Sequence, residues 1–191
     1  MNLRLFIAID IPEHVKKEIG ELLGILKKHD ADVKWIPPEN IHLTLKFLGT
    51  TPDSLVGKIR EALLPLVSSY EPFYITIQST GVFPSSKYPR IIWIGIIDSD
   101  TLIEVRNGIE SAMSLLGFQR EDKKFHPHLT VGRVRGQKGM ISLMQELDRS
   151  HDKQFGHFPV DQVKLMKSEL KPNGAEYSCL HTIPLGIDAA R

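Results

Sequence analysis

The pattern of apolar and polar positions predicts a chain of short strands separated by single helices. Strands are expected where apolar residues alternate with polar ones or run continuously, and helices where apolar residues recur every three or four positions. Pro65 is expected to fray or end the second helix, and the polar stretch 148–156 is expected to be a loop. The expected strands cover residues 3–9, 33–36, 41–48, 73–79, 91–97, 160–169 and 177–183, with another inside 125–133, and the expected helices begin near residues 14, 52, 101 and 140.

Two of these strands carry the same short motif. Residues 42–45 read His-Leu-Thr-Leu, and residues 128–131 read His-Leu-Thr-Val. Strand alternation places the His and the Thr of each motif on one face and the two apolar residues on the other, toward a core. One copy alone would more often be an ordinary strand whose His caps a carbonyl, because short motifs are common by chance. A second copy favours a functional interpretation if its surroundings repeat as well.

The elements around the two motifs recur in the same order. A strand and a helix precede each motif, and a helix and a strand follow it, with equivalent positions 86 to 88 residues apart, such as 3 and 91, 14 and 101, or 42 and 128. This repeat predicts one bilobal domain over residues 1–191, with lobes of roughly residues 1–85 and 86–191. An approximate twofold axis between the lobes would bring His42 and His128 face to face.

The order of elements predicts an α+β fold. We expect each lobe to be a small, mostly antiparallel sheet with helices on its outer face, and the active-site cleft to lie between the lobes. A doubly wound parallel sheet is the weaker alternative, because no Gly-rich phosphate loop follows the first strand. Residues 171–174, Lys-Pro-Asn-Gly, are expected to form the turn of a closing hairpin.

Composition and charge indicate a globular protein. Of 191 residues, 41% are hydrophobic and 25% are charged, with a net charge of +1, so a nucleic acid would have to bind at a local basic patch rather than in a general cationic field. The single cysteine, Cys179, excludes an internal disulfide, fits a reducing compartment and favours a structural role in a strand. The start of the chain lacks the form of a signal peptide, and no apolar run approaches membrane-spanning length, so we expect a cytoplasmic monomer.

The side chains of the motifs suit the opening of a cyclic phosphate by water. That reaction takes a proton from the attacking oxygen and delivers one to the leaving oxygen, on opposite sides of phosphorus. Two imidazoles, with an unperturbed pKa of about 6.5, can divide these tasks near neutral pH. The hydroxyls of Thr44 and Thr130 reach the same space and can donate hydrogen bonds to the non-bridging oxygens as negative charge develops.

The chain resembles the 2H phosphoesterase superfamily, named for two His-x-Thr-x motifs, and within it the RNA 2′,3′-cyclic phosphodiesterases, also called 2′-5′ RNA ligases. The resemblance extends over nearly the whole chain and depends on several blocks that occur in the family's order. These blocks are Arg4–Asp10 (RLFIAID), His42–Gly49 (HLTLKFLG), Pro89–Gly95 (PRIIWIG), Pro127–Arg133 (PHLTVGR) and Ser168–Leu170 (SEL).

The resemblance implies a metal-independent enzyme without a cofactor, whose partner is an RNA or nucleotide ending in a 2′,3′-cyclic phosphate and whose product is a 2′-phosphate. It implies that His42 is the acid toward the leaving 3′ oxygen and His128 the base, although the near symmetry of the motifs leaves this assignment open. It also implies that Arg133 binds the phosphate and Phe47 the base. The reverse reaction, joining a 5′-hydroxyl in a 2′-5′ link, would use the same groups, and the absence of a P-loop argues against an ATP-driven ligation.

Phe47 and Arg133 occupy equivalent positions, each five residues after its motif His. Strict alternation turns an odd offset away from the face of the His, so Arg133 requires a bulge, which Gly132 could supply. Core packing is an equal alternative for Phe47. Lys46 and Arg90 could add positive electrostatic potential near the cleft. The alternative is that they are ordinary exposed charges that only solvate the surface.

Two other segments leave alternatives open. The expected loop at 81–89 joins the two halves and carries aromatic and basic residues, which could stack on a base or form a plain surface connection. His126 lies two residues before His128 but has no counterpart at Asn40, so a supporting or surface role is favoured over catalysis.

Two further functional classes compete with the hydrolase. A non-catalytic module that binds RNA or nucleotides would use the same cleft without turnover. A His-based metallohydrolase would need more ligands, but the sequence has no His-Glu-x-x-His and no Asp or Glu near the motifs, so no metal site is expected.

Overall fold

The computed structural model describes residues 1–98, 100–121, 123–172 and 174–186. The fold is mixed α+β with antiparallel sheets, as the sequence predicts. The strands are β1 (Asn2–Asp10), β2 (Val33–Trp35), β3 (His42–Pro52), β4 (Phe73–Phe83), β5 (Ile91–Ile97), β6 (His128–Val134), β7 (Gln154–Val160), β8 (Gln162–Lys171) and β9 (Gly174–Pro184). The α-helices are α1 (Glu13–Leu26), α2 (Val56–Ser68), α3 (Asp100–Leu115) and α4 (Met140–Arg149), and short 3₁₀ helices are η1 (Lys27–His29), η2 (Pro38–Asn40) and η3 (Asp53–Leu55).

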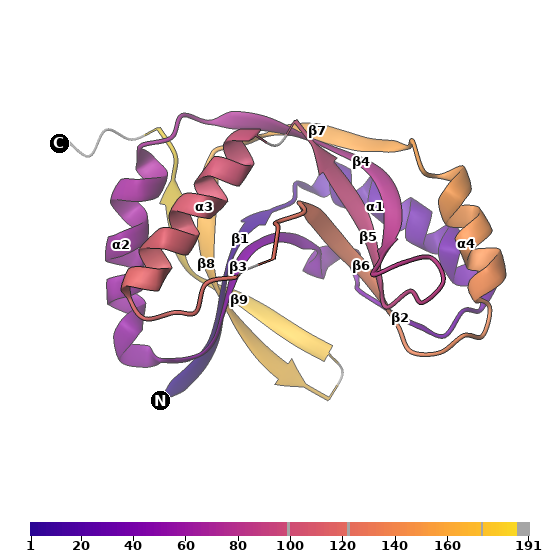
Figure 1. The fold of residues 1–191 in the computed structure, drawn as a ribbon, viewed down its shortest axis with the longest axis horizontal. Helices are drawn as coiled ribbons and strands as arrows, with labels where there is room; N and C mark the ends of the chain where they lie inside the picture. The colour runs from indigo at the N-terminus through magenta and orange to yellow at the C-terminus, as the bar shows by residue number, and fades with distance from the viewer. Residues whose placement is uncertain (99, 122, 173, 187–191) are drawn as a thin grey trace.

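The strands form two sheets with helices on their outer sides. Sheet A has the strand order β3-β1-β8-β9, and sheet B has the order β2-β6-β5-β4-β7. Helices α2 and α3 pack together on the sheet A side, whereas α1 and α4 cover the sheet B side (Figure 1). The β8–β9 hairpin projects from the body of the molecule, and Asn173 of its expected turn lies outside the described residues.

The two halves of the sequence exchange elements between the sheets. Strand β4 comes from the first half but pairs with β5 in sheet B, and β8 comes from the second half but pairs with β1 in sheet A. Helix α1 packs against β7, while α3 contacts β3. Each sheet therefore contains strands from both sides of residue 85, and the repeat in the sequence does not correspond to a boundary between the sheets.

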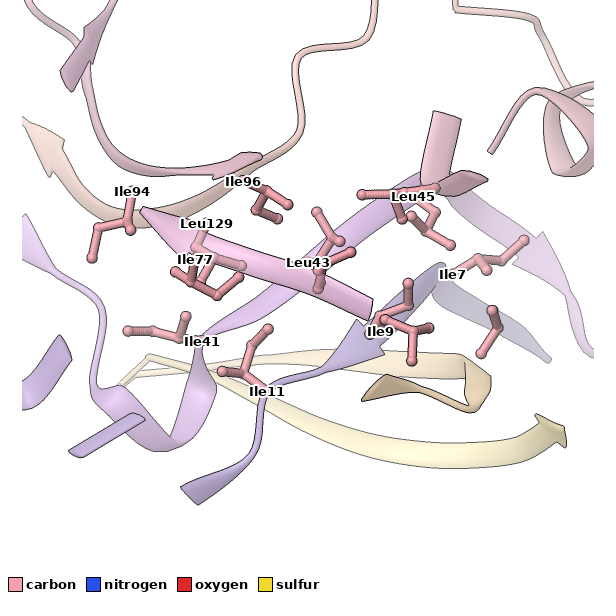
Figure 2. Packing of buried hydrophobic residues seen from close by; sticks show 14 of the residues in the cluster. Ile7, Ile9, Ile11, Ile41, Leu43, Leu45, Ile77, Ile94, Ile96 and Leu129 are labelled. Carbon is pink, nitrogen blue, oxygen red and sulfur yellow. The ribbon is translucent and has the colours of Figure 1, made fainter. Parts of the chain in front are cut away.

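One hydrophobic core joins the two sheets. Leu43 and Leu45 of β3 and Leu129 of β6 belong to the same buried cluster (Figure 2). The motif strands β3 and β6 contact each other although they belong to different sheets. The apolar residues of the motifs thus fix the two motif strands to one shared core. No helix in the described ranges has the length and apolar character needed to cross a membrane.

Several local expectations are wrong. Pro65 lies inside α2, which continues to Ser68 because Leu63 and Val67 are buried on either side of the missing hydrogen bond. Residues 154–160, partly expected to be a loop, form β7 along β4. Strand β4 continues to Phe83, so the connection to β5 is confined to residues 84–90. Cys179 lies on β9 as expected, but it is exposed.

Candidate active site

The motif residues alternate between core and solvent in the same way on both strands. Residues 42–47 of β3 and 128–133 of β6 share one burial sequence: half-buried, buried, half-buried, buried, buried, exposed. The half-buried positions are the His and the Thr of each motif, and the first two buried positions are the apolar residues. His42, Thr44, His128 and Thr130 therefore lie on the faces of the sheets that point away from the core.

A β-bulge on β6 determines where Arg133 lies. Thr130 and Gly132 face consecutive residues of β5, which leaves Val131 without a partner there. Both Val131 and Gly132 are buried, so the alternation shifts by one and Arg133 returns to the face of His128. A Cβ on Gly132 would lie 2.8 Å from Val33 Cγ1 of β2, so glycine is required there for close packing of the strands.

An equivalent β-bulge occurs on β3. Thr44 and Lys46 face consecutive residues of β1, so Leu45 is the unpaired residue, 86 positions before Val131. Phe47 thereby returns to the face of His42 and is 62% exposed. The interpretation of Phe47 as a core residue is wrong, and Phe47 and Arg133 occupy equivalent positions at the site.

The backbone orients both imidazoles in the same way. His42 Nδ1 lies 2.9 Å from the carbonyl oxygen of Asn40, and His128 Nδ1 lies 2.6 Å from that of His126. A carbonyl oxygen only accepts hydrogen bonds, so each Nδ1 carries the proton in the neutral ring. Nε2 of each ring is then the nitrogen that can accept or donate a proton. The contribution of His126 to this arrangement is made by its main chain.

Aromatic residues that the sequence motifs do not include support both rings. Tyr177 of β9 meets His42 edge-on with ring centroids 5.0 Å apart, and Phe6 of β1 lies 4.8 Å from the same ring. Phe83 of β4 meets His128 edge-on at 5.2 Å. Tyr177 and Phe83 come from strands far from the motifs in the sequence, so only the strand pairing reveals them.

Asp10 of β1 lies directly opposite His42 in sheet A. Its carboxylate accepts hydrogen bonds from Lys164 Nζ at 3.0 Å and from Lys16 Nζ at 3.4 Å. Burial acts to raise the pKa of Asp10, but the hydrogen bond from Lys164, the charges of both lysines and the Ile11 N–H together hold it below its usual value. Asp10 is therefore ionised at neutral pH and places a fixed negative charge beside His42.

The surroundings of His42 also change its own proton affinity. Burial lowers the pKa of His42 below its usual value, while the hydrogen bond to Asn40 and the charge of Asp10 act in the opposite direction. The charge of Lys16 adds to the lowering. A pocket of about 170 Å³ opens beside the ring, and Asp10, Lys16 and Tyr177 help to line it. In the free protein, the neutral form of His42 is favoured.

Different residues face the second motif in sheet B. His128 lies opposite Gly95 of β5, and Thr130 lies opposite Trp93. The Trp93 indole covers Gly81 of β4 so closely that a Cβ there would collide with the ring. Glycines at positions 81 and 95 therefore let this indole lie against the sheet beside Thr130.

Sequence comparison agrees with this geometry. The family model described as the 2′-5′ RNA ligase superfamily matches residues 11–172. The chain belongs to the 2′-5′ RNA ligase superfamily. The family predicted from the motif blocks is therefore confirmed.

Relatives and a solved structure match this superfamily member over almost its full length. The RNA 2′,3′-cyclic phosphodiesterase of Methanothermobacter thermautotrophicus is 33% identical over 185 residues, covering 97% of this chain and 100% of the relative. The protein of the same name from Methanocaldococcus jannaschii is 38% identical over 178 residues, covering 93% and 98%. The crystal structure of TT0787 from Thermus thermophilus superposes with a TM-score of 0.79 at 27% identity, covering 96% and 98%.

Lys46 does not contribute a free charge to the site. Its side chain is 3% exposed, and its Nζ lies 2.7 Å from Glu110 Oε2 of α3 and 2.9 Å from the carbonyl oxygen of Gln119. Arg106 also binds Glu110, at 3.2 Å. The expectation of positive potential from Lys46 is wrong, because the charge serves to fix α3 and the segment that leads to the second motif.

Metal ligands are not clustered in the part of the chain that the structure describes. No group of three or more His, Cys, Asp or Glu residues is placed to hold an ion there. The groups gathered at the two motifs are imidazoles and hydroxyls, which suit proton transfer and hydrogen bonding. That the reaction needs no metal stays a prediction.

Proposed function

We propose that this protein hydrolyses 2′,3′-cyclic phosphates at the ends of RNA, or on nucleosides, to 2′-phosphates. The observation that carries the proposal is the pair of matched imidazoles. His42 and His128 have the same Nδ1 bond to a carbonyl two residues earlier, on contacting strands with the same bulge. Acid and base catalysis on opposite sides of phosphorus requires two such groups.

In the proposed reaction, water attacks phosphorus and the bond from phosphorus to O3′ breaks. His128 Nε2 takes the proton from the attacking water, and His42 Nε2 gives its proton to O3′, which leaves a 2′-phosphate. His42 must be protonated in the substrate complex, although burial favours its neutral form in the free protein. The anionic phosphate supplies the compensation, because a nearby negative charge raises the pKa of an imidazole.

The remaining motif residues bind the substrate in this proposal. Thr44 and Thr130 donate hydrogen bonds to the non-bridging oxygens as charge increases in the transition state. Arg133 pairs with the phosphate through its planar guanidinium. Phe47, exposed on the His42 face, offers its ring to the base.

The relatives support the substrate class. Both relatives above are named RNA 2′,3′-cyclic phosphodiesterase, and each covers more than nine-tenths of this chain. We further propose that the protein acts as a cytoplasmic monomer; the single cysteine, which fits a reducing compartment, supports the cytoplasmic location.

The same groups would also catalyse 2′-5′ ligation. A 5′-hydroxyl in place of water would attack a 2′,3′-cyclic phosphate and form a 2′-5′ link, with His128 taking the proton of the 5′-hydroxyl and His42 giving its proton to O3′ as in hydrolysis. The two histidines would exchange roles only in the cleavage of that link. The test is to add an oligoribonucleotide with a 5′-hydroxyl at high concentration and to look for a joined product. Its new link should resist a nuclease that cleaves only 3′-5′ phosphodiester links.

The deciding experiment is incubation of the purified protein in EDTA with an oligoribonucleotide that ends in a 2′,3′-cyclic phosphate, followed by separation of 2′-phosphate from 3′-phosphate products. We expect only 2′-phosphate. His42→Ala and His128→Ala should each lower the rate by roughly 10²- to 10⁴-fold, the usual contribution of a general acid or base. His126→Ala is the matched control, because it keeps the carbonyl that orients His128.

Each alternative predicts a different result. RNA binding without turnover, in the original protein and in both His→Ala variants, would favour the non-catalytic module. Activity that EDTA abolishes and a divalent ion restores would favour the metallohydrolase. A mixture of 2′- and 3′-phosphates would contradict the assignment of O3′ as the leaving group.

A further inference from the structure

Exposed cations extend from the second motif along the outer part of sheet B. Lys34 of β2 pairs directly with Arg133 of β6, and both side chains are exposed. Directly opposed residues of a sheet share one face, so Lys34 lies on the face of His128 and Thr130. Arg135 follows two positions after Arg133 and is also exposed. These three residues, Lys34, Arg133 and Arg135, form a basic strip that begins at the proposed phosphate site.

The basic strip keeps its charge available, in contrast to the cations beside His42. Lys16 and Lys164 are both bound to Asp10. Among the ion pairs formed by the described residues, none includes a member of the strip. Asp32, two residues before Lys34, is exposed and offsets part of the charge. The strip therefore retains a net positive charge in a protein whose overall charge is only +1.

The strip ends beside the connection between β4 and β5, residues 84–90. Ile91, which follows this connection, pairs with Arg133, and the Val134 N–H donates to the carbonyl of Arg90, so the connection lies beside the end of β6 that leads to Arg135. It carries Tyr88, which is 62% exposed, and Lys87, whose Nζ lies 5.5 Å from the Tyr88 ring centre. An exposed aromatic ring beyond a row of cations is the combination that binds single-stranded nucleic acid, since bases stack on rings and phosphates pair with cations.

We propose that the RNA strand attached to the cyclic phosphate runs over sheet B, along Lys34 and Arg135 toward Tyr88. This proposal rests on the proposed function, because it assigns the strand that continues from the substrate end bound at the motifs. The strip binds internucleotide phosphates, and the ring of Tyr88 stacks on a base. Mononucleotide and oligonucleotide substrates therefore share the histidines but differ in their use of the strip.

The test compares two substrates and two readouts. Lys34→Gln/Arg135→Gln is the test variant, and Lys58→Gln/Arg60→Gln on the exposed side of α2 is the control with the same change of charge. Binding is measured by fluorescence anisotropy with a labelled RNA of about twelve nucleotides ending in a 2′-phosphate, a length within the range of single-strand sites. Turnover is measured with the same RNA carrying a cyclic phosphate and with a nucleoside 2′,3′-cyclic phosphate.

We expect the test variant to lose about tenfold in RNA affinity and in kcat/KM for the oligonucleotide at low salt, with the control unchanged. The dependence of log affinity on log salt should become shallower by about 1.4, or about 0.7 for each lost phosphate contact on a single strand. Turnover of the nucleoside cyclic phosphate should stay as in the original protein, because neither substituted residue contacts it.

Three results would overturn the proposal. Equal losses of kcat/KM for both substrates would show that the two cations act at the reacting phosphate itself. Unchanged affinity and kcat/KM for the oligonucleotide would show that the strand runs elsewhere. Arg4→Gln tests the opposite route, since Arg4 is an exposed cation on sheet A, and a loss confined to this variant would place the strand there. If the original protein turned over neither substrate, the proposed function would fail, while anisotropy would still decide whether the strip binds RNA.

Discussion

Strands β3 and β6 share a backbone arrangement but differ in the side chains around it. Both have the same burial sequence, the same unpaired residue three positions after the His, and the same Nδ1 bond to a preceding carbonyl. Five positions after the His, one strand presents Phe47 and the other presents Arg133. Opposite the His, one strand faces Asp10 and the other faces Gly95.

These differences give the two sides of the site different chemistry. The His42 side is lined by aromatic rings and by an ion cluster whose charges are compensated. The His128 side leads to the uncompensated basic strip. A duplicated backbone thus holds two proton-transfer groups in equivalent positions, while substitutions around it separate a side suited to a base from a side suited to phosphates.

The residue that follows the bulge differs most between β3 and β6. Substitution of the partner of this residue in β3 gives the largest predicted effect on the free energy of unfolding. Position 46 is a buried lysine bound to Glu110, whereas position 132 is a glycine packed against β2. Glu110→Gln would leave Lys46 and Arg106 buried without their carboxylate and should cost about 3–5 kcal/mol of unfolding free energy. Lys46→Met should cost less, because Arg106 still pairs with Glu110. Urea unfolding measures both.

Glu104→Gln serves as the control for this experiment, since Glu104 lies on the same helix and is exposed. Equal losses for Glu110→Gln and Glu104→Gln would contradict the structural role of the cluster. A larger loss for Lys46→Met than for Glu110→Gln would show that the bond from Lys46 to the Gln119 carbonyl, rather than charge compensation, fixes the segment before the second motif.

The second prediction separates the equivalent positions 47 and 133 by their kinetics. Arg133→Ala should lower kcat by roughly 10²- to 10³-fold, the usual effect of removing a donor to a charge that develops in the transition state. If the Phe47 ring stacks on the base, Phe47→Ala should mainly raise KM, and the loss of binding free energy should be about 1–3 kcal/mol. Arg133→Lys should restore little, because an ammonium cannot make the paired contact of a guanidinium. If Arg133→Ala raised KM and left kcat unchanged, the proposed difference between a phosphate-binding Arg133 and a base-binding Phe47 would be contradicted.

The sequence contains enough information to predict the strands of the motifs and the faces of their residues. Alternation alone places His42 with Thr44 and His128 with Thr130, and the structure shows both pairs away from the core. It also predicts the need for a bulge before Arg133, although the unpaired residue is Val131 rather than Gly132. The equivalent bulge at Leu45 has no glycine to indicate it, which is why the exposed position of Phe47 does not follow from the sequence pattern.

Pairing between distant segments is the part that local patterns do not contain. The pairing of β8 with β1, and the approach of Tyr177 and Phe83 to the histidines, join residues that are more than forty positions apart in the sequence. Strand β7 begins inside the polar stretch 148–156 and is stabilised by pairing with β4. Helix α2 passes Pro65 because tertiary packing outweighs the local loss of about 3 kcal/mol.

The last prediction concerns the protonation of the two histidines, where the expected effects are smallest. Burial lowers the pKa of His42, so its ring should titrate below the ordinary value of about 6.5 in the free protein. The folded state then binds fewer protons at this site than the unfolded chain. The contribution of His42 to stability is therefore full above the ordinary pKa and decreases as pH falls toward the folded value. NMR titration of the ring protons, assigned with His42→Ala, measures this shift.

Asp10→Asn should lower the pKa of His42 further, because the carboxylate favours the imidazolium and its removal leaves Lys16 without that compensation. If His42 is the acid, the alkaline limb of the kcat/KM profile should move to lower pH in this variant. Glu13→Gln is the matched control, since Glu13 also binds Lys16 but is exposed and does not act on His42. A rise in the His42 pKa in Asp10→Asn would show that loss of burial dominates over loss of charge. An acidic limb that moves instead would assign His42 as the base and reverse the roles of the two strands.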